Sequence, residues 1–239
     1  MAKSKKIAII LLLIFIVILA ATMPVAMYIG DYYRADGEAV DAFLDGKNIE
    51  YSKDSHGNLV FAPEGARLGF IFYPGGKVEK EAYIPLMVSL AERGVHCVLL
   101  DLSFNLAILD MNAAEGISEE YPKIEGWYVG GHSLGGVAAA SFAAENSVLG
   151  TVLLASYPTV DISAVPTLSV YGSLDGVMNM EKYNEGKALL PGDAREYVIE
   201  GGNHSGFGMY GHQAGDGEST LAEAEQIFIT RDLLLSFFE

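Results

Sequence analysis

The chain has 239 residues, of which 51% are hydrophobic, and a formal net charge of −16 at neutral pH. This length and composition allow one sizeable hydrophobic core, so we expect one folded domain with an accessory segment. The excess of negative charge repels a phosphate backbone and argues against nucleic acid as a partner.

The first thirty residues differ in composition from the rest of the chain. Lys3, Lys5 and Lys6 lie in a basic stub over residues 1–6, and residues 7–29 carry no charged side chain. As a helix, this run reaches roughly 35 Å and exceeds the hydrocarbon core of a bilayer, which is about 30 Å thick. Residues 7–29 are therefore predicted to form a transmembrane anchor that follows a cytoplasmic stub.

The flanking charges predict the orientation of this anchor. Lysines precede it, whereas Asp31, Glu38 and Asp41 follow it closely. The lysine bias favours a cytoplasmic N-terminus and predicts a single-pass protein of the cell membrane, with the remaining chain extracytoplasmic. The alternative is a cleaved signal peptide and a secreted protein, although the apolar run is longer than that of an ordinary signal peptide.

A series of short apolar runs follows the anchor. Residues 30–48 form a polar, partly helical neck, and two short runs around "DSHGN" predict a hairpin at the start of a domain over residues 49–239. The later runs are rich in aromatic and aliphatic residues and end in turn residues, which is typical of strands buried on both faces. These runs are "RLGFIFYPGG", "GVHCVLLDLSF", "EGWYVGGHS", "LGTVLLASYP", "VPTLSVYGSLD" and "AREYVIEGGNH".

Helical patterns lie between several of these strands. The stretch "EAYIPLMVSLAERG" carries apolar residues at i, i+3, i+4 and i+7 and closes on Gly94. The last segment opens with Thr220 and Glu223 at the spacing of a capping box. Strands that alternate with helices predict an α/β fold, in which helices flank a mainly parallel central sheet on both faces.

One serine lies in a glycine-rich turn, "GGHSLGG", between a predicted strand and a helix of small residues. Gly131, Ser133 and Gly135 fit the pattern G-x-S-x-G, in which a sharp turn lifts the serine hydroxyl above the sheet. The helix N-terminus and its free N–H groups favour a developing oxyanion there. The pattern predicts Ser133 as a nucleophile, and the alternative is a serine that only caps the helix.

A serine nucleophile needs a base, and the base needs an acid that holds it in the right tautomer. Asp175 and His204 each follow a later predicted strand, so the catalytic order is Ser, Asp, His. This order is associated with the α/β-hydrolase arrangement. The rival acid is Asp161, and the rival base is His212.

A double glycine follows the first central strand, in "FYPGGKVEKEAY". Its small residues allow the backbone to approach a substrate oxygen. We therefore assign the oxyanion hole to the N–H groups of Leu134 and Gly76, with Lys77 as the alternative to Gly76.

Together these motifs resemble those of the α/β-hydrolase fold-5 group. The resemblance is carried by "YPGGKVEKEAYIPL", "SFNLAIL", "GGHSLGG" and "GGNHSGFGMYGHQAGDG", and covers roughly residues 60–238. It implies a triad of Ser133, Asp175 and His204 on a sheet of eight strands or slightly fewer. It also implies hydrolase chemistry without a defined substrate.

The connection "TVDISAVPT" between two predicted strands is short at the point where many lipases insert a helical lid. We therefore expect no large lid and a shallow, open site for small or exposed acyl groups. The residues expected to border the pocket are Gly75, Phe104, Asn105, Asn203 and Phe207, and core packing is the alternative for Phe104.

The segment "GMYGHQAGDGEST" contains His212, Asp216 and Glu218, which invite interpretation as metal ligands. Their spacing does not match a known metal site, so we predict no metal and no other cofactor. We expect instead that this glycine-rich loop holds His204 in place.

The sequence therefore predicts a membrane-anchored serine hydrolase, similar to carboxylesterases, that acts on a carboxylic ester or related acyl bond of a small substrate. One alternative is an acyltransferase that modifies a component of the cell envelope with the same triad. An alternative of another class is a catalytically inactive, tethered binding or sensor module.

Overall fold

The computed structural model describes residues 2–239 of the chain, and the side chains of these residues except 2–4, 8 and 26. The chain divides into two compact units, of which the first ends at Tyr32 and the second is Tyr33–Glu239.

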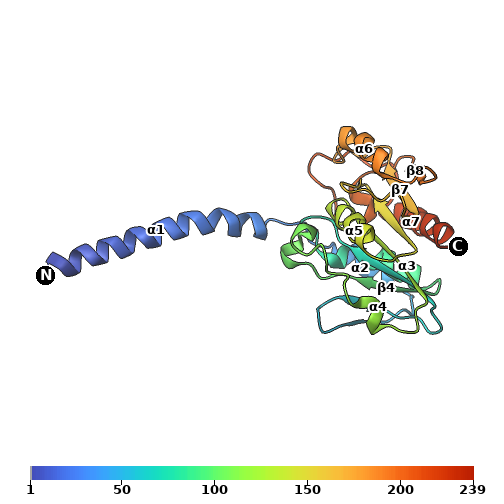
Figure 1. Ribbon diagram of the computed structural model, residues 1–239, viewed down its shortest axis with the longest axis horizontal. Coiled ribbons are helices and arrows are strands. Elements are labelled where there is room, and N and C mark those ends of the chain that lie inside the picture. The colour runs from blue at the N-terminus through green and yellow to red at the C-terminus, as the bar shows by residue number, and fades with distance from the viewer. Residues whose placement is uncertain (1) are drawn as a thin grey trace. The chain divides into compact units, whose positions relative to one another are not determined.

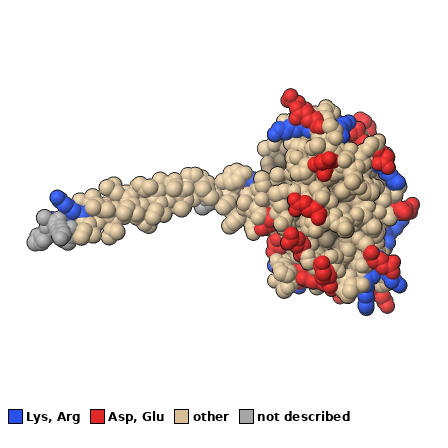
Figure 2. Space-filling view, viewed as in Figure 1, with Lys and Arg blue, Asp and Glu red and all other residues tan. Residues whose placement is uncertain are grey.

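The first unit is a single helix, α1 (Ala2–Gly30), and the predicted anchor lies inside it (Figure 1). The part Lys5–Gly30 is long and apolar enough to cross a membrane, a property that signal sequences share. On the face that Figure 2 shows, the described side chains of this helix carry no charge beyond the basic N-terminal end, in agreement with the uncharged sequence of residues 7–30. Acidic and basic side chains are instead scattered over the visible face of the second unit.

The second unit is built on one sheet of eight strands within the described residues, in the order β1-β2-β4-β3-β5-β6-β7-β8. β1 and β2 form the predicted antiparallel hairpin, and β2 pairs antiparallel with β4. The remaining neighbours pair in parallel, so the predicted, mainly parallel sheet is confirmed. The strands are β1 (Tyr51–Lys53), β2 (Leu59–Phe61), β3 (Leu68–Tyr73), β4 (Val95–Leu99), β5 (Gly126–His132), β6 (Gly150–Leu154), β7 (Thr167–Gly172) and β8 (Arg195–Ile199).

Helices cover both faces of this sheet (Figure 1). Along β3, Phe70 and Phe72 join a core with α3 and α7, whereas Ile71 and Tyr73 join a second core with α4 and α5. This alternation explains why the central strands are apolar throughout, since each face is buried under helices. The helices are α2 (Gly37–Leu44), α3 (Ile84–Ala91), α4 (Ile117–Glu120), α5 (Leu134–Glu145), α6 (Met180–Gly186) and α7 (Glu223–Phe238), with short 3-10 helices η1 (Lys80–Tyr83), η2 (Ser103–Asn105), η3 (Ala107–Leu109), η4 (Lys187–Leu189) and η5 (Ser205–Phe207).

Two sequence expectations about single elements are wrong. β8 is not buried on both faces, because it is an edge strand that pairs only with β7 and leaves all its residues but Ile199 exposed. The last helix has no capping box, since its N-cap is Ala222 and no side chain caps it. Thr220 Oγ1 instead donates a hydrogen bond to the Gly201 carbonyl, and so supports the turn after β8.

The neck predicted over residues 30–48 belongs to the folded unit from Tyr33 onward. The Tyr33 N–H donates to the Lys77 carbonyl at 2.7 Å, and the Asp36 side chain caps α2. Val40 of α2 is buried in the core beside α3, because this short helix is amphipathic. The polar composition of the neck therefore conceals one apolar face, and the folded unit starts before residue 49.

The connection between β6 and β7 contains turns and bends but no helix within the described residues 155–166. The expectation of a fold without a large lid at this point is confirmed.

Candidate active site

Ser133 lies in the sharp turn between β5 and α5, as the sequence predicted. Its backbone has φ 51° and ψ −121°, a conformation that costs an ordinary residue about 1–3 kcal/mol. Two hydrogen bonds hold it there: the Ser133 N–H donates to the Leu154 carbonyl at 2.8 Å, and Ser156 Oγ donates to the Ser133 carbonyl at 2.7 Å. The strained turn is therefore fixed by the neighbouring strand β6.

The glycines of the motif are required by close backbone approach. A Cβ atom on Gly131 would lie 2.4 Å from the Gly135 carbonyl carbon, and one on Gly135 would lie 2.2 Å from the Tyr73 carbonyl oxygen. Real Cβ atoms do not approach backbone this closely, so a larger residue at either position forces β3, β5 and α5 apart.

Asp175 and His204 come together at the carboxyl ends of β7 and β8. Asp175 Oδ2 lies 2.9 Å from His204 Nδ1, and both side chains are only 1% exposed. Asp175 Oδ1 accepts the N–H groups of Val177 and Met178 at 2.9 and 2.8 Å. The fixed carboxylate keeps the imidazole proton on Nδ1 and leaves the lone pair of Nε2 free.

Ser133 and His204 line the same cavity, which has a volume of about 190 Å³. None of the described residues forms a hydrogen bond with His204 Nε2, although this atom is buried. The other lining residues, mostly apolar, are Leu134, Val137, Ala155, Ser156, Tyr157, Val177, Met178 and Asn179. A hydroxyl and an unsatisfied basic nitrogen thus share a small, mainly apolar space.

The backbone hydrogen bonds distinguish between the candidate oxyanion donors. The Lys77 N–H is not available to an oxyanion, because it donates to the Asn105 carbonyl at 2.7 Å. The Gly75 N–H is not available either, because it donates to the Tyr83 hydroxyl at 3.0 Å. Within the described chain, the N–H groups of Gly76 and Leu134 donate to no other residue. The two segments touch, since a Cβ on Gly76 would lie 3.0 Å from Leu134 Cδ2.

The glycine-rich loop after His204 is organised by one carboxylate. Asp216 Oδ1 accepts the N–H groups of Gly176 and His204, both at 3.1 Å, and Oδ2 accepts that of Ser205 at 2.8 Å. Burial disfavours the charged form, but the backbone N–H donors outweigh it and lower the pKa of Asp216 below its ordinary value. Asp216 therefore ties the loop that carries Asp175 to the loop that carries His204.

Asp216 and Gln226 are structural residues of this site that sequence reasoning did not single out for this role. The Gln226 side chain is buried and pairs with the Asn203 backbone, accepting its N–H at 3.0 Å and donating to its carbonyl at 2.9 Å. The only sequence signal was an acid within a loop of glycines. His212 and Glu218 are exposed and 4.0 Å apart, and they do not converge with Asp216 on one point.

Asn203 and Phe207 do not line the Ser133 cavity, contrary to expectation. Phe207 is fully buried in the core with its ring 5.6 Å from that of His132, because η5 turns the chain inward. The Asn203 side chain is used within its own loop, where it donates to the Gly217 carbonyl at 2.8 Å.

Asn105 contacts the loop of residues 75–77, which is the candidate oxyanion loop, and neither Phe104 nor Asn105 lines the Ser133 cavity. Both have positive φ, and the Asn105 carbonyl holds the Lys77 N–H. The Phe104 ring is 55% exposed, so it is neither a core residue nor a wall of the cavity. Gly75 does not line the cavity either, and its N–H donates to the Tyr83 hydroxyl.

The rival acid and base stand apart from the Ser133 cavity. The exposed Asp161 carboxylate accepts the Ser163 N–H at 2.9 Å, which is the local loop role that was its alternative. Hydrogen bonding from the Ser163 side chain, and next from its backbone N–H, lowers the pKa of Asp161. The His212 side chain is 47% exposed and lines a different, smaller cavity.

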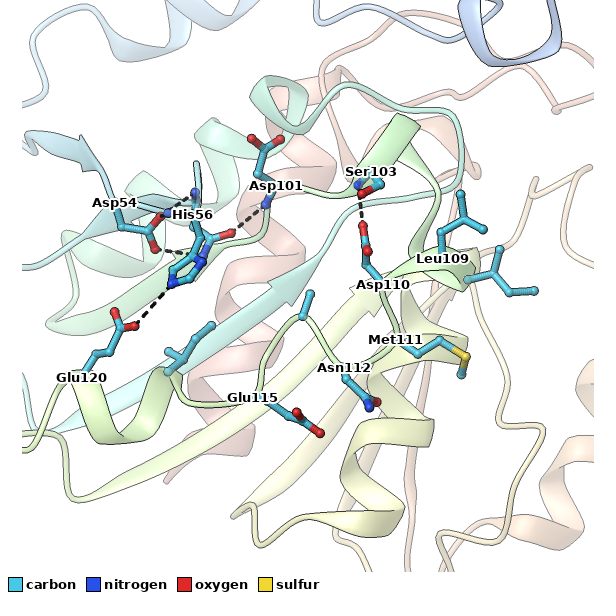
Figure 3. A pocket seen from close by; sticks show the side chains of 14 residues that line it. Asp54, His56, Asp101, Ser103, Leu109, Asp110, Met111, Asn112, Glu115 and Glu120 are labelled. Carbon is cyan, nitrogen blue, oxygen red and sulfur yellow. Dashed lines mark hydrogen bonds and ion pairs between the residues drawn. The ribbon is translucent and has the colours of Figure 1, made fainter. Parts of the chain in front are cut away.

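A larger cavity of about 600 Å³ lies between the early hairpin and the segment after β4 (Figure 3). His56 and Glu120 point toward one another across it at 3.7 Å. The Asp54 and Asp110 carboxylates accept backbone N–H groups of their own loops, from His56 and Ser103 respectively. No residue of the Ser133, Asp175 and His204 group lines this cavity.

A match to a protein-family model identifies the family to which this chain belongs. The model of the alpha/beta hydrolase family matches residues 69–228, well over half of the chain. The chain belongs to the alpha/beta hydrolase family. The predicted resemblance is thereby confirmed, and this α/β hydrolase shares its fold with many solved structures.

Three of these structures show the extent of the likeness. A putative hydrolase from Agrobacterium vitis has a TM-score of 0.60 at 16% identity, covering 81% of this chain and 100% of its own. A dienelactone hydrolase from Anabaena variabilis has a TM-score of 0.54 at 16% identity, covering 79% and 97%. An esterase from Thermogutta terrifontis, solved with propionate bound and also phosphoramylated by tabun, has a TM-score of 0.54 at 15% identity, covering 81% and 95%. A comparison with curated proteins finds no match.

Proposed function

We propose that this α/β hydrolase is a membrane-anchored serine hydrolase that cleaves esters of short acyl groups. The observation that carries the proposal is the buried contact of 2.9 Å between Asp175 and His204, beside a cavity that His204 shares with Ser133. A nucleophile, a base and an acid that orients the base are the groups that acyl transfer through serine requires.

The reaction follows from the positions of these groups. Ser133 Oγ attacks the acyl carbonyl carbon while His204 Nε2 accepts its proton, and the carbonyl oxygen becomes an oxyanion held by the N–H groups of Gly76 and Leu134. The carbon–oxygen ester bond then breaks, and His204 returns the proton to the departing alcohol. Water repeats the sequence on the acyl-enzyme, which releases the carboxylic acid and restores Ser133.

The size of the cavity favours short acyl groups. Its volume of about 190 Å³ is about six times the roughly 30 Å³ that a water molecule occupies in the liquid. Val137, Tyr157 and Met178 line it with mainly apolar surface, which suits a short hydrocarbon chain. The similar esterase from Thermogutta terrifontis, solved with propionate bound, supports a short acyl group.

The test is hydrolysis of p-nitrophenyl esters from acetate to decanoate by the full chain in detergent. We expect kcat/KM to be highest for acetate to butyrate and to fall with longer acyl chains. A fluorophosphonate probe should label the protein, and Ser133→Ala should abolish both turnover and labelling. Folded protein that neither hydrolyses any ester nor reacts with the probe would overturn the proposal and favour a binding module.

We also propose that α1 anchors the hydrolase in the cell membrane with the folded unit outside the cytoplasm. The helix carries no charged residue from Ile7 to Gly30, and the folded unit begins at Tyr33, whose backbone pairs with Lys77 and Glu79 beside the proposed oxyanion loop.

Cell fractionation tests the anchor. The full chain should be found in the membrane fraction with its N-terminus intact, and added protease should digest the folded unit on cells whose outer layers are opened. Deletion of residues 2–30 should remove it from that fraction. Recovery of a shortened chain, cut after the apolar helix, in the soluble extracytoplasmic fraction would show that the helix is a signal peptide.

A further inference from the structure

A buried tyrosine and histidine lie behind the proposed oxyanion loop. Tyr83 and His132 are both fully buried, and the Tyr83 hydroxyl lies 2.8 Å from His132 Nδ1. The same hydroxyl accepts the Gly75 N–H at 3.0 Å. One phenol therefore connects the loop that precedes Gly76 to the residue that precedes Ser133.

The proton positions in this pair follow from counting donors and acceptors. Burial raises the pKa of Tyr83, so the phenol keeps its proton, and the Gly75 N–H already uses one of its lone pairs. If the phenol donates to His132 Nδ1, a single buried polar group, Nε2–H, is left unsatisfied. The reverse arrangement leaves both the phenol proton and Nε2 without a partner, so the first is favoured.

His132 is consequently a neutral imidazole beside the proposed base. Burial, and next the charge of a protonated His204, lower the pKa of His132 well below its ordinary value and outweigh the opposite effect of the His204 backbone. The ring centroids of His132 and His204 are 4.6 Å apart. A Cβ on Gly75 would lie 2.7 Å from both His132 Nδ1 and the Tyr83 hydroxyl, so the oxyanion loop rests directly on this pair.

We propose that Tyr83 and His132 are positioning residues for the reaction at Ser133. Their hydrogen bond fixes the loop of Gly75 and Gly76, so that the Gly76 N–H is directed at the oxyanion. The His132 ring holds His204 in place by contact. This inference rests on the proposed function, and it adds residues that the motif and the triad do not include.

The expected kinetic effect follows from when the oxyanion forms. A donor that acts only on the oxyanion stabilises the transition state and not the bound ester, so its displacement lowers kcat and leaves KM almost unchanged. Complete loss of one oxyanion donor costs about 10²- to 10³-fold in kcat in a serine hydrolase. Because Tyr83→Phe displaces the donor without removing it, we expect a loss of about ten- to a hundredfold.

Tyr73→Phe provides a matched control for Tyr83→Phe. Tyr73 is also fully buried, donates to the Met111 carbonyl at 2.8 Å and accepts the Ala114 N–H at 3.1 Å. Both substitutions therefore remove one donated and one accepted hydrogen bond in the interior. We expect both to lower the melting temperature, but only Tyr83→Phe to lower kcat, with KM within about twofold of the wild-type value.

Two substitutions of His132 test whether the hydrogen bond from Tyr83 is the feature that matters, because one keeps an acceptor and the other does not. The amide oxygen of His132→Asn can accept the Tyr83 proton, whereas His132→Leu cannot, so the Asn variant should retain more of kcat than the Leu variant. The double variant Tyr83→Phe, His132→Leu should lose little more than either single variant, because both remove the same hydrogen bond. Fully additive losses would overturn the assignment of the pair as one unit.

The labelling rate with a fluorophosphonate gives a second measurement that needs no known ester substrate, because the phosphonyl oxygen takes the place of the oxyanion. Slower labelling of Tyr83→Phe than of Tyr73→Phe supports the inference. Equal kcat and equal labelling rates in these two variants would overturn it and leave the proposed function intact. Absence of both turnover and labelling in the unaltered protein would overturn the proposed function together with the inference.

Discussion

Asp175→Asn is expected to lower kcat for short esters by about 10⁴-fold, the effect that the same change has in an established serine triad. Asp175 Oδ2 is the partner of His204 Nδ1 at 2.9 Å, and both side chains are almost fully buried. The amide nitrogen of asparagine would meet this ring nitrogen as a donor. The imidazole proton would then move to Nε2, which could no longer accept the proton of Ser133.

The fold should survive this change. Asparagine keeps a carbonyl oxygen that can accept the N–H groups of Val177 and Met178, which Asp175 Oδ1 accepts now. The melting temperature and KM should therefore change far less than kcat. The measurement is steady-state hydrolysis of p-nitrophenyl acetate, followed beside thermal unfolding of the same samples.

Asp161→Asn is the matched control, because Asp161 was the rival acid in the sequence and its carboxylate interacts with Ser163 of its own loop. This exposed residue should be replaceable without loss of kcat. If Asp161→Asn lost activity and Asp175→Asn kept it, the assignment of the acid would be reversed.

The sequence was sufficient to bring the three residues of the proposed triad to one edge of the sheet, because each of them follows a strand end. Ser133, Asp175 and His204 follow β5, β7 and β8, and parallel neighbouring strands bring their carboxyl ends to one edge of the sheet. The apolar runs marked β5 and β7 reliably, since burial on both faces leaves no polar alternation. The run that marked β8 also located a strand, although β8 is an edge strand with four of its five residues exposed. The contact between Asp175 and His204 thus follows from local patterns and topology.

The supporting residues could not be predicted because their partners are distant in the chain and are backbone groups. Asp216 holds the Gly176 N–H, and Gln226 of α7 holds the Asn203 backbone. Hydrogen bonds to backbone leave no pattern of paired residue types. The prediction of a capping box at Thr220 is wrong for the same reason, because the Thr220 hydroxyl donates to the Gly201 carbonyl and not to the first turn of the helix.

The exposure of individual side chains could not be predicted from the sequence either. Phe207 follows the predicted base closely and suggested a pocket wall, but η5 turns it into the core. Phe104 suggested either pocket or core, yet its positive φ directs the ring to solvent. In both cases the direction of the side chain depends on one turn whose geometry has no distinctive sequence.

Asp216→Asn is the second change for which we expect a large effect, this time on stability and activity together. The Asp216 carboxylate accepts N–H groups from the loops of both Asp175 and His204, and hydrogen bonds to a charged group contribute about 1.5–3 kcal/mol. Asparagine keeps one acceptor oxygen, so we expect a loss of about 2 kcal/mol, or roughly 4–8 °C in melting temperature. A small displacement of His204 should lower kcat about ten- to a hundredfold.

The pH dependence of this loss identifies the carboxylate as its cause. Hydrogen bonding lowers the pKa of Asp216 in the folded protein, so its contribution to stability is fully present above the unfolded-state pKa of about 4. The contribution disappears as the pH falls through the lower, folded-state pKa. The difference in free energy of unfolding between wild type and Asp216→Asn, measured in urea, should be constant from about pH 6 to 8 and should shrink below about pH 4.

Glu218→Gln separates this specific role from a general effect of charge. Glu218 lies in the same loop and loses the same charge, but its side chain is 93% exposed. Its substitution should leave both the unfolding free energy and kcat near the wild-type values, since exposed charges contribute little. Equal effects of Glu218→Gln and Asp216→Asn would show that the loop responds to net charge. A loss confined to Asp216→Asn would instead follow from hydrogen bonds that one carboxylate makes to the loops of the acid and the base.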